Sequence, residues 1–403
     1  MAQVGQGGVM AIFAERESVS TSGVTATESV EHTWPTSLPS ARVLLVALLL
    51  LSLAFSVSVI FRAQNPYGTL EPKYTDHLRH ERYAEELLHR GLGLYSEPAG
   101  QLTRFGWEDD RTYIWPEVSY PYPVGALLFH LPAGVAIYRL GVNPVLVNQL
   151  VIVAYVALAH IGVFLFAREW LLTGRGGNIF IGLWLVAAFW ALVVVWSLNA
   201  QFEALPLLFP LLAARRYWQG RHLEAALWVG VALFFKYQAA IFAPLVLGML
   251  WQARSQGWRT LWRPGLVALM GVVGLDLYTT VISYHFVQIP EANLVSLDAL
   301  LAGRWVPTGF RLLATATLTV SLTGLLAWRR QWMLAASAAF AVLFLASLPQ
   351  VQGWYVLWLF PLALFGRGTD RDSVGFWTLG LCYLIYQLPD PAYLAGAFAP
   401  FFH

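Results

Sequence analysis

Long apolar runs recur from residue 43 almost to the C-terminus, and this pattern restricts the fold more than any other feature of the chain. A hydrocarbon layer about 30 Å thick is crossed by roughly 20 apolar residues in a helix. The chain is 58% hydrophobic and 12% charged, unlike an ordinary soluble domain. The sequence therefore predicts an all-α, multi-pass membrane protein. A net charge of +2 without a basic tail gives no indication of a nucleic-acid partner.

About 11 transmembrane helices are expected from windows of this length. The predicted spans cover approximately residues 43–61, 144–167, 178–197, 202–217, 223–236, 238–252, 265–286, 309–327, 332–348, 354–366 and 374–388. The segment 123–140 is predicted to lie along the membrane surface instead. It follows a Tyr-Pro-Tyr-Pro sequence and is interrupted by Pro132 and Gly134, which disfavour a straight crossing helix.

Arginines gather in alternate breaks between these spans, for example Arg215 with Arg216 and Arg329 with Arg330. Because positively charged loops remain in the cytoplasm, these breaks are predicted to be cytoplasmic, with the N-terminus inside and the C-terminus outside. Residues 1–40 are rich in Ser, Thr, Gly and Glu and have no hydrophobic period. They are predicted to form a disordered cytoplasmic tail, followed by one membrane domain over residues 41–403.

The segment between the first two predicted spans, residues 62–140, is called the first loop here. It holds 10 of the 23 acidic residues of the chain and is predicted to be extracytoplasmic. Thr75 and Asp76 begin a predicted helix, because a hydroxyl cap and a first-turn carboxylate stabilise a helix N-terminus. Gly91 and Gly93 favour its end. The weak apolar stripe of this helix is typical of helices that lie on a membrane surface.

Lys236 is one of only two lysines and lies inside an apolar run. Such a charge costs about 2.5–3.5 kcal/mol on insertion scales, so Lys236 is a functional candidate. The alternative is that its amine only snorkels to the outer interface. His77 and His80 are followed by Glu81, but this is not the spacing of a zincin site. Cys382 is the single cysteine, so neither a disulfide nor a cysteine-based metal site is predicted.

Four motifs follow one another along the chain. They are Tyr74-Thr75-Asp76-His77 with Gly91-Leu92-Gly93-Leu94-Tyr95, Tyr120-Pro121-Tyr122-Pro123, Asn199-Ala200-Gln201-Phe202-Glu203-Ala204-Leu205 with Lys236-Tyr237-Gln238, and Gln352-Gly353-Trp354-Tyr355-Val356-Leu357-Trp358 with Pro361. In their order and sidedness these motifs resemble those of the GT-C glycosyltransferases, integral membrane enzymes that use polyprenyl-phosphate sugars. Together they cover most of residues 43–366. Within the family the chain is most similar to the bacterial polyprenyl-phosphate-mannose-dependent mannosyltransferases.

The resemblance implies an inverting transfer of a hexose, with mannose favoured, from a polyprenyl-phosphate donor to a lipid-linked or cell-envelope acceptor. The reaction is expected on the outer side of the bacterial plasma membrane. Asp76 matches the family's catalytic carboxylate and is assigned as the general base, with Glu117 as the second catalytic candidate. Lys236 and Arg304 are the expected partners of the donor phosphate, since lysine and arginine both bind phosphate groups.

The other substrate-binding candidates are His77, His80, Gln201, Gln238, Gln352 and Tyr355. The histidines would handle protons or bind phosphate. Gln201 has the alternative of a hydrogen bond between helices, and Tyr355 that of an aromatic belt at the interface. Some relatives carry a histidine or an acidic residue where this chain has residues 349–353 without either. That role then falls to Gln352, to Arg304 or to the first loop.

No cofactor is expected, although some relatives use a divalent ion, for which Asp76 or Glu117 would be the ligands. Two other functions remain open. A transporter or flippase of lipid-linked saccharides would be expected to have internal repeats and several charges near mid-membrane. A non-catalytic envelope-assembly protein would not need the carboxylate of Asp76.

Overall fold

The structure is a computed structural model of the chain. It describes residues 39–62, 76–95, 120, 122–171, 178–254, 265, 268–276, 306–347, 353–366 and 368–386. Within these ranges every regular element is a helix and there is no strand. The predicted cytoplasmic tail, residues 1–40, lies almost entirely outside them.

The helices follow one another as α1 (Pro39–Arg62), α2 (Asp76–Arg90), η2 (Gly91–Tyr95), α3 (Val124–Tyr138), α4 (Pro144–Leu171), α5 (Ile179–Leu198), α6 (Ala204–Trp218), α7 (His222–Phe235), η4 (Tyr237–Phe242), α8 (Ala243–Ala253), α11 (Val306–Trp328), α12 (Trp332–Ser347), η5 (Gly353–Leu359), α13 (Phe360–Ala363) and α14 (Gly368–Tyr386). The helix expected after Asp76 and the one expected at 123–140 are both present, as α2 and α3. The predicted span at 354–366 forms a 3-10 helix and one short α-helix rather than a continuous α-helix.

Among the described residues, three helices are long and apolar enough to cross a membrane by length and composition, namely α1, α4 and α5. Other apolar helices, including α7, are shorter. Only residues 265 and 268–276 of the predicted span 265–286 are described. The chain therefore has the helical and apolar character of a membrane protein, and the number of about 11 crossings stays a prediction.

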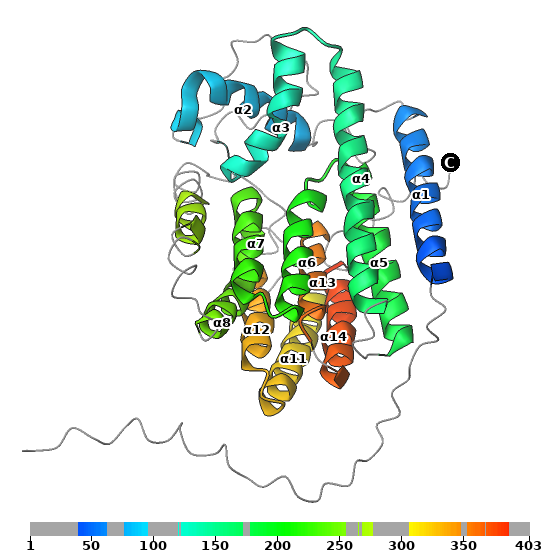
Figure 1. Cartoon of the computed structure of the whole chain (residues 1–403), viewed down its shortest axis with the longest axis vertical. Coiled ribbons are helices and arrows are strands. Elements are labelled where there is room, and N and C mark those ends of the chain that lie inside the picture. Colours follow the sequence, from blue (N-terminus) through cyan, green and yellow to red (C-terminus); the bar gives the residue numbers. More distant parts are fainter. Residues whose placement is uncertain are drawn as a thin grey trace, which may run out of the picture. The chain divides into compact units, whose positions relative to one another are not determined.

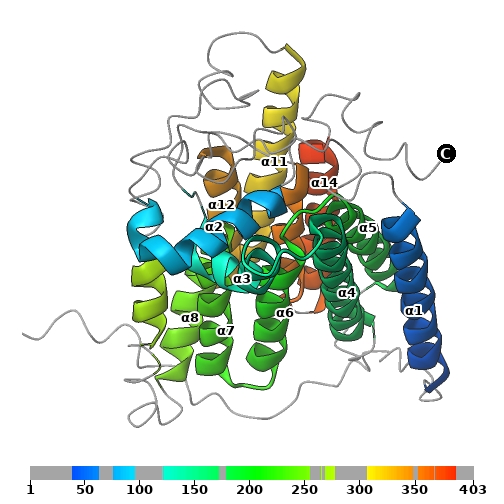
Figure 2. The same ribbon diagram turned by 90° about the horizontal axis from the view of Figure 1, so that it is seen from above.

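The longest helix, α4, packs against α1, α5 and α6, and α6 packs in turn against α7. At one end of this bundle, α2 packs against α3, and α3 contacts both α4 and α7. Figures 1 and 2 show α2 lying across this end, with α3 beside it. Two predominantly apolar clusters fill the interior, a large one between the long helices and a smaller one beneath α2 and α3.

The arginine-bearing breaks meet at the other end of the bundle. Hydrogen bonds join these segments, from Arg371 Nη2 to Glu169 O (2.6 Å), from Gln331 Nε2 to Asp370 Oδ2 (2.5 Å), and from Trp218 Nε1 to Leu364 O (2.7 Å). The end of α4, the α6–α7 and α11–α12 turns and the start of α14 therefore lie together. This agrees with the grouping of the arginines, while the side of the membrane that this end faces stays a prediction.

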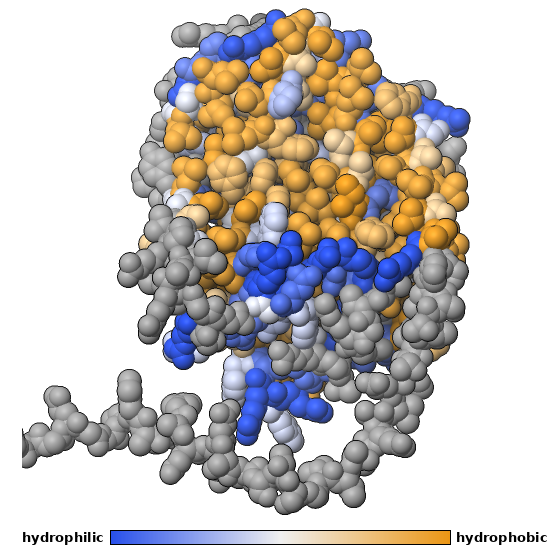
Figure 3. All heavy atoms as spheres, in the orientation of Figure 1, coloured by the Kyte–Doolittle hydropathy of each residue, from blue (hydrophilic) through white to orange (hydrophobic). Residues whose placement is uncertain are grey.

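The outside of the bundle carries large apolar side chains that no other part of the described chain covers. Leu51 of α1, Trp184 of α5 and Val320 of α11 are each about two-thirds exposed or more. Figure 3 shows a broad hydrophobic face between two hydrophilic edges. Such a face is unusual on a soluble monomer and fits contact with lipid.

Candidate functional site

Two interruptions between consecutive helices, one between α5 and α6 and one between α7 and η4, bring charged residues into the interior of the bundle. α5 ends at Leu198, and Ala200 has a left-handed backbone (φ 61°) before α6 begins at Ala204. α7 ends at Phe235, because Lys236 is extended (φ −154°, ψ 129°). Both interruptions lie in the part of the bundle that α2 and α3 cover, since Phe202 and Phe235 contact the apolar cluster beneath those helices.

The side chains of Lys236 and Glu203 form a buried ion pair at these interruptions. The Nζ atom of Lys236 donates to Glu203 Oε1, and the two side chains are only 3% and 1% exposed. Trp358 Nε1 donates to the second carboxylate oxygen at 2.7 Å, so both oxygens of Glu203 are bound. Lys236 therefore does not extend toward the interface, and the snorkelling alternative is wrong for this structure.

A second polar group lies beneath α2 and α3 and contains two stacked histidines. The ring centroids of His80 and His130 are 4.6 Å apart, and His80 Nδ1 lies 2.6 Å from the Tyr120 hydroxyl. His130 Nδ1 is 2.6 Å from Ala126 O and therefore carries the proton. Its Nε2 atom is left to accept a hydrogen bond from the Tyr155 hydroxyl. Burial lowers the pKa of His130 to about 3, so this ring is neutral at physiological pH.

Tyr122 connects the histidines with the ion pair. Its ring centroid is 4.7 Å from that of His80 and 5.4 Å from Lys236 Nζ. Its backbone carbonyl accepts a hydrogen bond from the Tyr95 hydroxyl at 3.0 Å. Tyr122 therefore lies between His80 of α2 and the charged centre of the bundle, and the two polar groups form one continuous site.

Three of the predicted substrate-binding residues lie on the segments that form this site. Gln201 and Gln238 are each two residues from a member of the ion pair, and both are buried. The Tyr355 hydroxyl lies 3.5 Å from that of Tyr237, which follows Lys236 in the chain. With His80 and Lys236, the structure thus brings together five of the predicted site residues.

The structure describes the remaining predicted site residues only in part or not at all. Asp76 and His77 are the first two residues of α2, and the structure does not describe their side chains. Glu117, Arg304 and Gln352 lie outside the described residues. Among the residues that are described, no group of three His, Cys, Asp or Glu side chains is arranged to hold a metal ion.

Tyr120, Tyr122, Glu203 and Trp358 lie in the sequence motifs but were not among the predicted site residues, and His130 and Tyr155 were not singled out. His130 had a recognisable signal, because it is the only histidine of an apolar helix. The role of Glu203 as the counter-ion of Lys236 depends on two helix interruptions that come together only in the folded chain.

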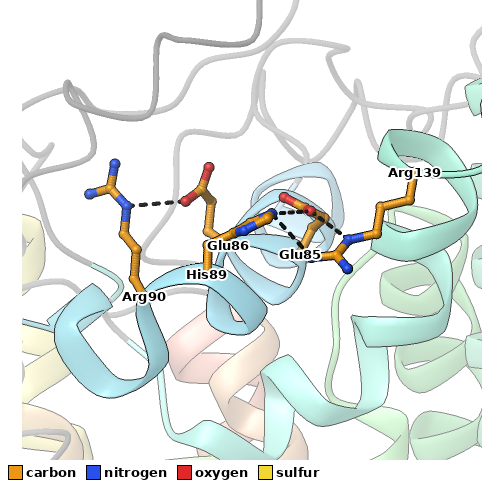
Figure 4. A network of polar contacts seen from close by, with 5 residues as sticks. All are labelled: Glu85, Glu86, His89, Arg90 and Arg139. Carbon is orange, nitrogen blue, oxygen red and sulfur yellow. Dashed lines mark hydrogen bonds and ion pairs between the residues drawn. The ribbon is translucent and has the colours of Figure 1, made fainter.

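Ion pairs apart from the site join α2 to the end of α3 and link residues within α2. Glu85 binds Arg139 at 3.0 Å and His89 at 2.9 Å, while Glu86 pairs with Arg90 (Figure 4). On the inner side, Glu81 is fully buried, and neither of its carboxylate oxygens has a partner among the described residues. Burial raises the pKa of Glu81 well above its usual value and so favours the protonated carboxyl.

Comparison of the chain with models of protein families, with curated proteins and with solved structures found no match. The site must therefore be interpreted from its own chemistry. It combines one cation, a carboxylate, two histidines, several tyrosine hydroxyls and two carboxamides inside a bundle whose interior is predominantly apolar.

Proposed function

We propose that the chain is a membrane glycosyltransferase of the GT-C type that transfers a hexose, with mannose favoured, from a polyprenyl-phosphate donor. The acceptor is a lipid-linked or cell-envelope molecule on the outer side of the bacterial plasma membrane. The observation that carries this proposal is the buried Glu203–Lys236 pair, which continues through Tyr122 to His80 beneath the surface helices. Ionisable residues inside a membrane bundle are costly and usually mark a functional site.

The proposed chemistry requires a base for the acceptor and a cation for the leaving phosphate. The acceptor oxygen attacks the anomeric carbon while the bond from that carbon to the phosphate oxygen breaks. The electron pair of that bond leaves with the phosphate, and the proton of the acceptor passes to the carboxylate of Asp76. Attack from the face opposite the phosphate inverts the anomeric carbon. Glu117 is the alternative base.

Lys236 is the proposed cation for the donor phosphate. Its ammonium group has three N–H donors and can bind Glu203 and a phosphate oxygen together. Glu203 and the Tyr122 ring hold the amine in place in the absence of a ligand. A fixed cation stabilises the charge that develops on the leaving phosphate without having to reorganise. Arg304, His77 and Gln352 remain further proposed contacts of the substrates.

A lipid-linked saccharide transporter is the second candidate, and one observation favours it. Lys236 and Glu203 are buried inside the bundle, and ionisable residues in such positions mark substrate pathways in transporters as well as enzyme sites. The two functions differ in covalent chemistry. A transferase moves the sugar to a new acceptor, whereas a transporter moves the intact lipid-linked saccharide between the leaflets.

The test is sugar transfer by purified protein reconstituted in liposomes with a radiolabelled polyprenyl-phosphate mannose and a membrane-lipid acceptor fraction. The wild type should form a labelled product, and Lys236→Met should form much less. Arg221→Met, which removes an exposed charge at the opposite end of the bundle, is the matched control and should behave as wild type. Wild-type transfer rates in Lys236→Met would refute the phosphate assignment. Movement of intact donor between leaflets without a product would support the transporter.

A further inference from the structure

Two buried carboxamides, each two residues along the chain from a member of the ion pair, have hydrogen-bonding atoms without partners among the described residues. Gln238 is 0% exposed, and neither its Oε1 nor its Nε2 atom has a partner among the described residues. Gln201 is 7% exposed, and its Oε1 atom likewise has no partner in the described part of the chain. Native proteins satisfy nearly all buried polar groups, and each exception calls for an explanation.

The position of the two side chains points to a shared role. Gln201 precedes Glu203 by two residues at the α5–α6 interruption, and Gln238 follows Lys236 by two residues in η4. The ion pair between Glu203 and Lys236 joins these two interruptions, so the carboxamides are attached to the two sides of one junction. Tyr237, whose hydroxyl lies near that of Tyr355, belongs to the same junction.

The carboxamide atoms without partners among the described residues include both donors and acceptors, and this restricts the chemistry of a ligand that could bind them. A carboxamide oxygen needs a ligand that donates a hydrogen bond, and a carboxamide nitrogen needs one that accepts. A fully ionised phosphate only accepts, so it would leave the oxygens of Gln201 and Gln238 without partners. A hydroxyl group donates and accepts at once and satisfies both kinds of atom. Sugars offer several such hydroxyls around one ring, with apolar C–H faces that suit tyrosine rings.

We propose that Gln201 and Gln238 form a binding site for the hydroxyl groups of a sugar ring, separate from the phosphate contact of Lys236. The inference rests on the proposed function insofar as the sugar is that of the donor or the acceptor. It gives the carboxamides a different ligand chemistry from the lysine of the ion pair. It also differs from the alternative given above for Gln201, a hydrogen bond between helices.

The sign of a stability change separates a ligand-binding role from a structural one. Replacing an unpaired buried polar group by an apolar group of similar shape is nearly neutral or stabilising, whereas breaking a structural hydrogen bond is destabilising. Gln238→Met and Gln201→Met keep the length of the side chain. Without a ligand, both variants should therefore unfold at or above the wild-type temperature in a detergent without a sugar headgroup, such as lauryldimethylamine oxide.

The probes are methyl α-mannoside and methyl α-glucoside, titrated while the unfolding temperature is measured. At least one of them should raise the unfolding temperature of the wild type. Gln238→Met should need a glycoside concentration higher by about tenfold or more, since a lost contact of 1.4 kcal/mol changes an affinity tenfold. Asn148→Leu is the matched control, because Asn148 of α4 is also fully buried and has no partner among the described residues. It should retain the wild-type response.

Three results would overturn the inference: no response of the wild type to either glycoside up to the solubility limit, an unchanged response in Gln238→Met, or marked destabilisation of that variant without ligand. The first result includes the case in which water alone satisfies the carboxamides. Failure of the proposed function is distinguishable from these results. A protein that binds glycosides through Gln238 yet transfers no sugar would keep the binding site and lose the transferase.

Discussion

Lys236 and Glu203 are 33 residues apart in the chain and form an ion pair in which both side chains are buried. The pair connects the end of α7 with the start of α6, where both helices are interrupted. Trp358 of η5 binds the same carboxylate, so three separate segments meet at Glu203. The charged centre therefore contributes to the arrangement of the bundle as well as to the proposed chemistry.

Removing one member of the pair should cost more stability than removing both. Glu203→Gln or Lys236→Met alone leaves an uncompensated buried charge, which typically costs about 3–5 kcal/mol. The double variant should recover part of this loss, because an apolar or neutral pair avoids the desolvation penalty. Unfolding of the four proteins in detergent gives the coupling free energy directly. Additive losses would show that the two side chains do not depend on each other.

The contact between α2 and α3 should not tolerate a methyl group at Gly134. A Cβ atom there would lie 2.3 Å from the backbone oxygen of Glu81, so α2 would have to move. We expect Gly134→Ala to destabilise the protein by about 1–3 kcal/mol, the usual cost of overpacking. Gly324→Ala in α11 is the control, because an added Cβ meets nothing within 4 Å there. That variant should be neutral or slightly stabilising, since alanine is the better helix former.

His130 should make the stability of the protein fall in acid. Its pKa is lowered to about 3 in the folded state, below the ordinary value of 6.5 in the unfolded chain. The unfolded chain therefore takes up a proton between these values, and stability present above pH 6.5 is lost as the pH falls toward 3. The slope from this group is about 1.4 kcal/mol per pH unit. His130→Gln should show a shallower loss between pH 7 and pH 5, and an equal slope would contradict the assignment.

The predicted topology can be tested by labelling single cysteines in intact cells. Glu108→Cys lies in the first loop and should react with a membrane-impermeant maleimide from outside. Arg329→Cys, in the turn between α11 and α12, should react only after permeabilisation. The native Cys382 is buried and gives little background. The opposite labelling pattern would show that the orientation predicted from the arginines is reversed.

Much of the helical framework could be predicted from the lengths of the apolar runs and from the positions of the breaks between them. The bounds of α1, α4, α5 and α7 lie within a few residues of the predicted spans, because long apolar runs leave few alternatives to a helix. The helix that begins at Asp76 was recognisable from its capping residues and its terminal glycines. The 3-10 geometry of η5 was missed, because an apolar run does not reveal which hydrogen-bonding pattern its backbone adopts.

The site was only partly predictable. His80, Lys236 and Gln238 were identifiable as polar residues in motifs or apolar segments. The partners that give them their environment, Tyr122 and Glu203, come from distant segments. Their contacts depend on side-chain packing and on the backbone interruptions, which periodicity and composition do not encode.

Asp76 is the proposed base of the sugar transfer, and the variant Asp76→Asn tests this role. Asparagine keeps the shape of the side chain and its hydrogen-bonding capacity but is not basic. Loss of a general base typically costs about 10²–10⁴-fold in rate. Glu86→Gln is the control on the same helix, since it makes the same exchange of a carboxylate for a carboxamide at a residue that pairs with Arg90.

The decisive measurement is transfer from radiolabelled polyprenyl-phosphate mannose by reconstituted protein, beside donor binding in the same sample. Asp76→Asn should bind the donor as the wild type does and form almost no product, whereas Glu86→Gln should form product normally. Transfer at the wild-type rate by Asp76→Asn, with binding intact, would remove Asp76 from the mechanism and direct attention to Glu117.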